Sequence, residues 1–251
     1  VYYEDSFLLT QLKYYPLAQL GIIGLFVMIA YLLFSTARKA EQNQVWVGMS
    51  KETAHQLGTP LSSMIGWVEL LKEEPKTAQI ALELEKDVSR LQVVTERFSK
   101  IGSQPELVLV DLCKLLRNTI DYFELRSGKN VTFEIEMPDE LMVVLNESLF
   151  EWVIENLIKN ALDAMDGVGT IKTVVSDQDH RVLIDITDSG KGIVPGDFKT
   201  IFEPGFTSKK RGWGLGLSLS KRIVKEYHQG KIYVLKSVLG SGSTFRISLR
   251  K

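Results

Sequence analysis

A continuous apolar segment near the start of the chain is its most prominent hydrophobic pattern. Residues 17–34 read LAQLGIIGLFVMIAYLLF, and only Gln19 and two glycines interrupt the apolar side chains. A helix of this length crosses about 30 Å of hydrocarbon. The pattern therefore predicts a transmembrane helix over residues 17–36.

Charges on either side of this segment indicate its orientation. Arg38 and Lys39 follow it, and a positive flank is typical of the cytoplasmic side of a membrane. We therefore expect residues 1–16 to be an extracytoplasmic stub. A buried core helix and a cleavable signal peptide are the alternatives, although Glu4 and Asp5 are not typical of a signal peptide. Because the chain does not begin with methionine, we expect a fragment, with any input domain upstream or in a partner.

Two amphipathic helices follow the apolar segment. Small or apolar residues recur in alternating steps of three and four from residue 47 to 71, and a second stripe runs from residue 80 to 101. Glu73-Glu74-Pro75 separates the two stripes, so residues 41–101 predict a helical hairpin. Such a hairpin cannot bury its seam alone. We expect two copies to form a dimeric four-helix bundle, with packing against the rest of the chain as the alternative.

The pattern changes again after Pro105. Over residues 106–251, short strands at hairpin spacing alternate with helices, which predicts an α+β sandwich with helices on one face of a mixed sheet. The expected helices are residues 111–125, 146–165 and 217–227, and the expected strands are 131–136, 141–145, 170–175, 181–187, 231–235 and 243–249. The chain is therefore expected to be multidomain.

Composition adds mainly exclusions. Among 251 residues, 45% are hydrophobic and 24% are charged, which excludes a disordered chain. A net charge of −1 provides no electrostatic reason to bind nucleic acid, and we expect no such partner. The single cysteine, Cys113, excludes a disulfide framework and a cysteine-based zinc site.

Three clusters in the last domain carry candidate chemistry. Asn156 and Asn160 are four residues apart on one helical face, and their neutral oxygens suit Mg²⁺ beside nucleotide phosphates. Residues 188–192, DSGKG, place a carboxylate in a glycine turn, where it can accept a hydrogen bond from an adenine amino group. Residues 211–217, RGWGLGL, open a helix whose N-terminus favours phosphate. Each cluster alone is weak, but their order predicts a nucleotide-binding domain.

With these motifs, residues 106–251 resemble the GHKL (Bergerat) ATP-binding domain shared by histidine kinases, gyrase, MutL and Hsp90. The segments that carry this resemblance are residues 156–160 (N box), 188–192 (G1 box), 201–209 (F box), 212–217 (G2 box) and 240–244 (last glycine motif). In the hairpin, residues 54–61, AHQLGTPL, resemble the H box of sensor histidine kinases, usually HELRTPL. The resemblance spans residues 41–251.

The resemblance implies a homodimeric, membrane-bound sensor histidine kinase of a two-component system. We expect one span in the bacterial inner (cytoplasmic) membrane, with membrane lipid as a partner. Such an enzyme autophosphorylates a histidine, here His55, and passes the phosphoryl group to an aspartate of a response regulator receiver domain. Ala54 and Leu57 lie on the seam, so His55 points away from the bundle core. Thr59 matches the residue that supports phosphatase activity in related proteins, and Pro60 predicts a bend in a continuous helix.

The resemblance also implies ATP and Mg²⁺ as cofactors and assigns their contacts. Asn160 would ligate Mg²⁺, Asn156 and Lys159 would contact phosphates, and Asp188 would bind adenine. The further nucleotide-binding residues are Gly190, Gly192, Phe206, Lys209, Gly212, Gly214, Leu215, Gly216, Leu217 and Thr244.

Two positions depart from the family pattern beside His55. Gln56 replaces an acidic residue that acts as a general base or orienting partner, and an amide cannot take a proton. We therefore expect slower autophosphorylation, or activation of His55 by another group or by water. Gly58 replaces an arginine near the transferring phosphate.

Two alternative functions remain open from the residues. The loss of acid at Gln56 supports a catalytically weak, membrane-anchored ATP-binding scaffold. A GHKL ATPase is disfavoured, because its glutamate base would lie where this chain has Asn156, and Glu155 is rotated by about 100° on the helix.

Overall fold

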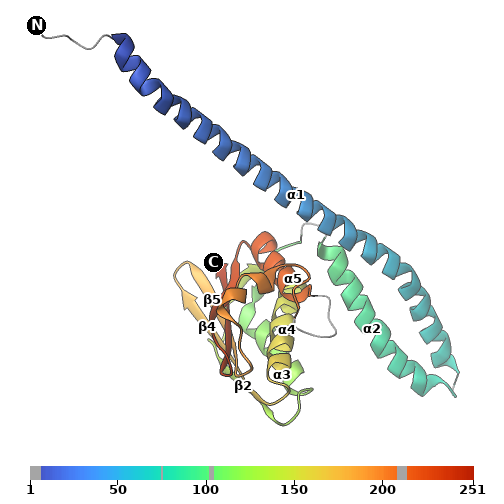
Figure 1. Ribbon diagram of the computed structural model, residues 1–251. Coiled ribbons are helices and arrows are strands. Elements are labelled where there is room, and N and C mark those ends of the chain that lie inside the picture. The colour runs from blue at the N-terminus through green and yellow to red at the C-terminus, as the bar shows by residue number, and fades with distance from the viewer. Residues whose placement is uncertain (1–6, 75, 102–104, 208–213) are drawn as a thin grey trace, which may run out of the picture. The chain divides into compact units, whose positions relative to one another are not determined.

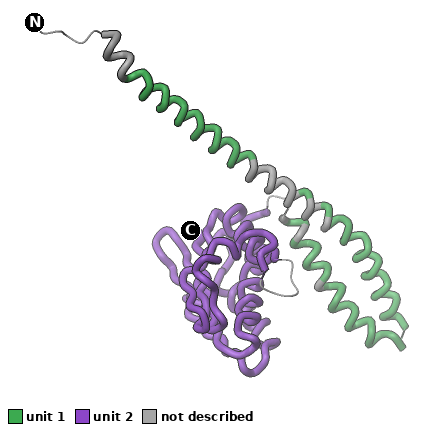
Figure 2. Tube along the Cα trace, in the orientation of Figure 1, with its two compact units in different colours: residues 1–102 green, residues 103–251 purple. Residues whose placement is uncertain are grey.

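The computed structural model describes the backbone of residues 7–74, 76–101, 105–207 and 214–251, and their side chains except at 7–13, 38–47, 49–51, 53, 90, 98 and 101. The chain divides into two compact units, an N-terminal unit of residues 1–102 and a C-terminal unit of residues 103–251 (Figure 2).

One continuous helix dominates the N-terminal unit. Helix α1 spans Phe7–Glu73, and helix α2 spans Ala78–Ile101 (Figure 1). The sequence pattern predicted a membrane helix and a separate hairpin helix, whereas α1 includes both, with Pro60 inside it. The joining residues are rich in Ala, Arg, Lys, Glu and Gln, which are good helix formers, so nothing in them ends the helix.

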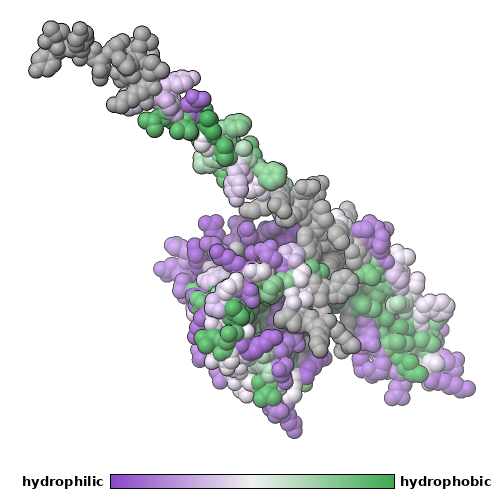
Figure 3. All heavy atoms as spheres, in the orientation of Figure 1, coloured by the Kyte–Doolittle hydropathy of each residue, from purple (hydrophilic) through white to green (hydrophobic). Residues whose placement is uncertain are grey.

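The first half of α1 presents apolar side chains on all sides. Tyr14–Ala37 has a mean hydropathy of 2.3 over its most apolar part and no buried residue, and it is long and apolar enough to cross a membrane. Figure 3 shows apolar side chains on the visible face of the described part of this helix. A helix that is apolar all round is typical of a membrane span or of a protein core, and here no residue of the segment is buried.

Half of the predicted hairpin seam is buried between α1 and α2. Ala54, Leu61 and Val68 recur every seven residues on α1, and all three are buried, as are Ala81 and Val88 on α2. Leu61, Val68 and Val88 form one apolar cluster. Packing against α2 therefore accounts for every second residue of the seam.

The C-terminal unit is built on a mixed five-stranded sheet with the order β2-β4-β5-β7-β6. These strands are β2 (Val131–Glu136), β4 (Gly169–Gln178), β5 (Arg181–Asp188), β6 (Lys231–Val238) and β7 (Gly242–Arg250). β2 is parallel to β4, and the other pairs are antiparallel. Alternate residues of β5 are buried, so Asp188 occupies the last inward position of that strand.

Three helices cover one face of this sheet, namely α3 (Leu112–Glu124), α4 (Glu147–Ala164) and α5 (Gly216–Arg222) (Figure 1). Asn146 caps α4 by accepting a hydrogen bond of 3.1 Å from the Leu149 backbone N–H. The predicted α+β sandwich is thus confirmed. The pattern missed the four-residue strand β1 (Val108–Asp111), which pairs antiparallel with β3 (Met142–Leu145).

The end of the last predicted helix differs from expectation. After α5, residues Ile223–Tyr227 form a π-helical turn instead of a continued α-helix. His228 follows this turn, and its Nδ1–H donates to the Ile223 carbonyl at 2.9 Å while its Nε2 accepts from the Asn146 N–H at 3.0 Å. His228 is therefore a buried core histidine, and burial lowers its pKa.

Candidate functional site

The N box and the G2 box meet where α4 contacts α5. The Asn156 Nδ2 donates a hydrogen bond of 2.9 Å to the Ser220 Oγ. A side chain at Gly216 would collide with the Asn156 Oδ1, so the Asn156 amide would have to move to make room for it. The contact of Ser220 was not predicted, because the only signal for this residue is its place one helical turn after Gly216.

Asp188 lies at the inner end of β5 with a carboxyl group that is almost enclosed. The residue is 4% exposed, and its Oδ1 accepts a hydrogen bond of 2.9 Å from the Gly190 N–H. Burial raises the pKa of Asp188 above its ordinary value, while backbone N–H groups of Gly190 and Ser243 oppose that shift. A desolvated carboxylate of this kind is a strong acceptor for a ligand amino group.

The turn after Asp188 is attached to the end of α4. A Cβ atom on Gly190 would lie 2.6 Å from the Ala164 carbonyl carbon, and the Lys191 N–H donates to the Ala164 oxygen at 3.0 Å. On the neighbouring strand, the Thr244 Oγ1 is 3.0 Å from the Thr187 Oγ1. The G1 box and the last glycine motif therefore lie together beside the helix that carries the N box.

The F box is anchored to the core beside α5. Phe202 is buried and packs edge-on against Phe245, with 6.3 Å between the ring centroids. The Gly205 N–H donates to the Gly214 oxygen at 3.0 Å, which joins the F box to the G2 box. Phe206 is partly exposed next to this junction.

Leu215, Gly216 and Leu217 form the N-terminus of α5, where the Leu219 N–H donates to the Leu215 carbonyl at 3.0 Å. The predicted contacts Lys209 and Gly212 lie outside the described residues.

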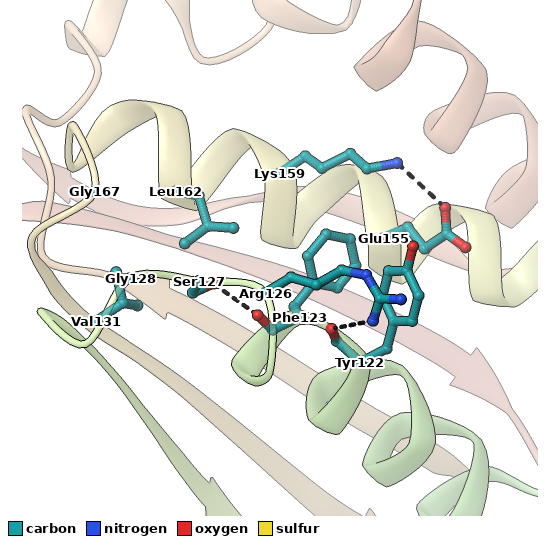
Figure 4. Close-up of a pocket in the computed structure, with 10 residues that line it drawn as sticks. All are labelled: Tyr122, Phe123, Arg126, Ser127, Gly128, Val131, Glu155, Lys159, Leu162 and Gly167. Atoms are coloured by element: carbon teal, nitrogen blue, oxygen red, sulfur yellow. Dashed lines mark hydrogen bonds and ion pairs between the residues drawn. The ribbon is translucent and has the colours of Figure 1, made fainter. Parts of the chain in front are cut away.

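The Lys159 side chain points to a different side of α4 from Asn156. Its ammonium group is 3.4 Å from a Glu155 oxygen and 5.7 Å from the Phe123 ring centroid. Figure 4 shows it beside a hollow of about 400 Å³ between α3 and α4, which Arg126 also lines. Residues 155 and 159 share a stripe of α4 that is rotated by about 100° from the stripe of the two asparagines, and this rotation separates Lys159 from Asn156.

The chemistry of the described residues suits a metal ion that takes most of its ligands from phosphates. No group of three or more His, Cys, Asp and Glu side chains able to hold a metal occurs among them. Asn160 is half-buried one turn after Asn156 and offers a neutral oxygen. Because Mg²⁺ keeps several waters and takes ligands from substrate phosphates, few protein ligands are needed to hold it.

His55 is exposed on α1 in the N-terminal unit. It lines a hollow of about 790 Å³ between α1 and α2, together with Thr59 on its own helix and Glu96 on α2. The adjacent Gln56 is engaged elsewhere, because its Nε2 donates to the Glu52 Oε1 at 2.7 Å. The placement of Glu96 near His55 was not predicted, since only the packing of α2 against α1 brings the two residues to one hollow.

Known proteins resemble both units. Residues 145–251 match the family of histidine kinase-, DNA gyrase B- and HSP90-like ATPases. Sporulation kinase E of Bacillus subtilis is 30% identical over 84% of this chain and 29% of its own length. Sensor histidine kinase ZraS of Escherichia coli K12 is 33% identical over 86% of this chain and 48% of its own length.

Solved structures agree with this result. The catalytic domain of histidine kinase ThkA aligns with a TM-score of 0.54 and 31% identity over 58% of this chain and 96% of that domain. Histidine kinase ThkA in complex with response regulator protein TrrA aligns with a TM-score of 0.54 and 26% identity over 81% of this chain and 61% of that one. The chain belongs to the histidine kinase family, and its C-terminal unit has the GHKL-type fold. It spans about half or less of the length of the curated relatives named here.

Proposed function

We propose that this protein is a membrane-anchored sensor histidine kinase that transfers the γ-phosphoryl group of ATP to His55. The phosphoryl group then passes to an aspartate of a response regulator receiver domain. The observation that carries this proposal is the assembly of Asn156, the Asp188 turn and the N-terminus of α5 around one helix, in a chain that also exposes a histidine on a helical hairpin.

The nucleotide contacts follow from the chemistry of each group. Asp188 accepts a hydrogen bond from the adenine amino group, and Thr244 lies on the strand next to it. Asn156 and the backbone N–H groups at the start of α5 face the phosphates. Asn160 holds Mg²⁺, which would neutralise negative charge on those phosphates.

We also propose that the hairpin dimerises through the half of its seam that α1 and α2 leave open. Leu57 and Met64 on α1 are 44% and 46% exposed, and Leu84 and Leu91 on α2 are 41% and 50% exposed. Each pair is seven residues apart, as the facing positions of a four-helix bundle are.

The histidine stays accessible in such a bundle. His55 belongs to an α1 stripe with residues 48, 52, 59 and 62, which lines the hollow described above. On a helical wheel this stripe is opposite Leu57 and Met64, so a partner on the seam does not cover it. Receiver docking and a phosphatase role of Thr59 would use this open face.

Incubation of the chain with γ-labelled ATP tests the kinase proposal. A histidine phosphate is labile in acid and stable in alkali, so we expect label with these properties that is lost in the variant His55→Gln. ATP binding without any label would contradict the kinase and support the scaffold. The amide of Gln56 next to His55 is the observation that favours this second function, because an amide cannot take a proton.

A further inference from the structure

The hollow beside His55 contains the acidic groups that position 56 lacks. Its α1 wall includes Glu52 and its α2 wall includes Glu96, and these are the only charged side chains besides His55 among the described residues that line it. Apart from His55 and these two acidic side chains, the described lining residues are small or hydroxylated: Gly48, Ala54, Gly58, Thr59, Ser62, Thr95 and Ser99. Any carboxylate that serves His55 from within this hollow is therefore one of two.

Glu52 is inclined away from the histidine. Its Oε1 accepts a hydrogen bond of 2.7 Å from the Gln56 Nε2, whereas the Glu96 Oε1 accepts a longer one of 3.4 Å from the Gln92 Nε2. Glu52 also precedes His55 by three residues on one helix, and helical side chains tilt toward the N-terminus of their helix. The carboxyl group of Glu52 thus extends toward the N-terminus of α1 and away from the His55 ring.

Glu96 approaches from the opposite direction. Helix α2 runs back along α1 after the turn at residues 74–77, so its side chains tilt the other way along the hairpin (Figure 1). His55 follows the buried Ala54, and Glu96 follows Thr95, which lines the same hollow from α2. Both residues therefore lie on the same side of the helix pair, opposite the exposed seam.

We propose that Glu96 accepts the ring proton of His55 during autophosphorylation and so replaces the acidic neighbour absent at position 56. This inference rests on the proposed kinase function. One ring nitrogen of neutral His55 forms the bond to the γ-phosphorus while the bond from that phosphorus to the β,γ-bridging oxygen breaks, and ADP leaves with that electron pair. The proton on the other ring nitrogen moves to the Glu96 carboxylate and from there to water, which leaves a phosphohistidine with an uncharged ring and an anionic phosphoryl group.

Initial rates of autophosphorylation in the full chain, reconstituted in lipid nanodiscs, test this assignment. We expect Glu96→Gln to lower the rate at saturating ATP by about 100-fold, within the usual contribution of a general base, with an unchanged KM for ATP. The matched control is Glu52→Gln, which removes the other carboxylate of the same hollow and should keep the rate within about threefold of wild type.

A second variant separates proton transfer from structure. Gln56→Glu restores an acid next to the histidine. The double variant Gln56→Glu and Glu96→Gln should therefore autophosphorylate at least tenfold faster than Glu96→Gln alone. A merely structural defect at residue 96 would not be repaired from position 56.

The possible failures are distinguishable. Label in wild type together with an undiminished rate in Glu96→Gln would overturn the role of Glu96 and leave the kinase proposal intact. A loss of rate that Gln56→Glu cannot recover would also overturn it. Absence of label in wild type would instead overturn the proposed function, and this inference with it.

Discussion

At the scale of single residues, Asp188 shows how the fold prepares a binding group at a cost in stability. The alternation of β5 places this carboxyl group on the buried face of the sheet, where the backbone N–H groups of Gly190 and Ser243 donate hydrogen bonds to it. Because the folded pKa is raised above the unfolded value, stability is lost as the pH rises from the unfolded pKa through the folded one. The burial of this carboxyl group therefore weakens the folded chain as the pH rises.

Replacement of this residue should separate stability from binding. We expect Asp188→Asn to leave the midpoint of thermal unfolding at pH 7 equal or higher, because an amide carries no desolvation penalty for an ionised form. ATP affinity should fall by about 10- to 100-fold, since an amide donor would face the adenine amino group and a charged acceptor is lost. Calorimetric unfolding and equilibrium binding of an ATP analogue measure the two effects. Weaker stability with normal affinity would contradict this account of Asp188.

At the scale of elements, the contact between α4 and α5 joins motifs that are 60 residues apart. Asn156 and Ser220 are hydrogen-bonded, and Gly216 leaves no room for a side chain against Asn156. Neither motif contains information about the other. The packing of α5 on α4 brings the two motifs together into one surface.

A methyl group at this contact should damage the site selectively. We expect Gly216→Ala to displace the Asn156 amide and to reduce ATP affinity at least tenfold, with less than about 1 kcal/mol lost in stability, because the displaced group is the end of a flexible side chain. Gly196→Ala is the matched control, because a Cβ there meets nothing within 4 Å. Isothermal titration with an ATP analogue and urea unfolding of both variants measure these effects. Equal affinity in the two variants would show that the close approach of Gly216 is unimportant.

The hairpin is the second case at this scale. Its heptad pattern predicts one seam, yet packing divides that seam into a buried half at Ala54, Leu61 and Val68 and an exposed half at Leu57 and Met64. A charge in the exposed half would be desolvated in a dimer and solvated in a monomer, so it acts on assembly alone.

We expect the double variant Met64→Glu and Leu91→Glu to be monomeric at concentrations where wild type is dimeric. The helical content should be retained, because the buried half of the seam is unchanged. Light scattering coupled to size exclusion gives the mass, and circular dichroism gives the helix content. Gln79→Glu, an exposed residue of α2 off the seam, is the control. A dimer that survives the double variant would place the interface elsewhere.

At the scale of the whole molecule, the apolar segment of the N-terminal unit and the C-terminal unit differ in how their apolar side chains are removed from water. The C-terminal unit has its own buried core, whereas Tyr14–Ala37 has no buried residue. Exposed apolar surface of this extent requires lipid or a partner. Membrane attachment should therefore depend on the first 40 residues alone.

Removal of residues 1–40 should release the chain into the soluble fraction of cells that express it. The full chain should stay with membranes after an alkaline carbonate wash, which removes peripheral proteins. Binding of an ATP analogue should differ by less than about twofold between the two forms, because the candidate nucleotide site lies entirely in the C-terminal unit. Recovery of the full chain in the carbonate supernatant would contradict a transmembrane segment.

The sequence by itself determined the elements and the chemistry they carry, because hydrophobic period, caps and motif spacing are properties of contiguous residues. The span, the hairpin stripes, most strands and the order of the nucleotide boxes belong to this class. Departures were local, as in the continuous α1, where helix-forming residues join two segments that the pattern treated separately.

Only the tertiary structure decided which of those residues meet. It directs Lys159 toward α3 and away from Asn156, pairs Asn156 with Ser220, encloses Asp188, and places Glu96 in the hollow of His55. These neighbours come from different elements, and their proximity depends on packing and register between surfaces far apart in the chain. The spacing along one helix determines which of its residues share a face, but not which other element packs against that face.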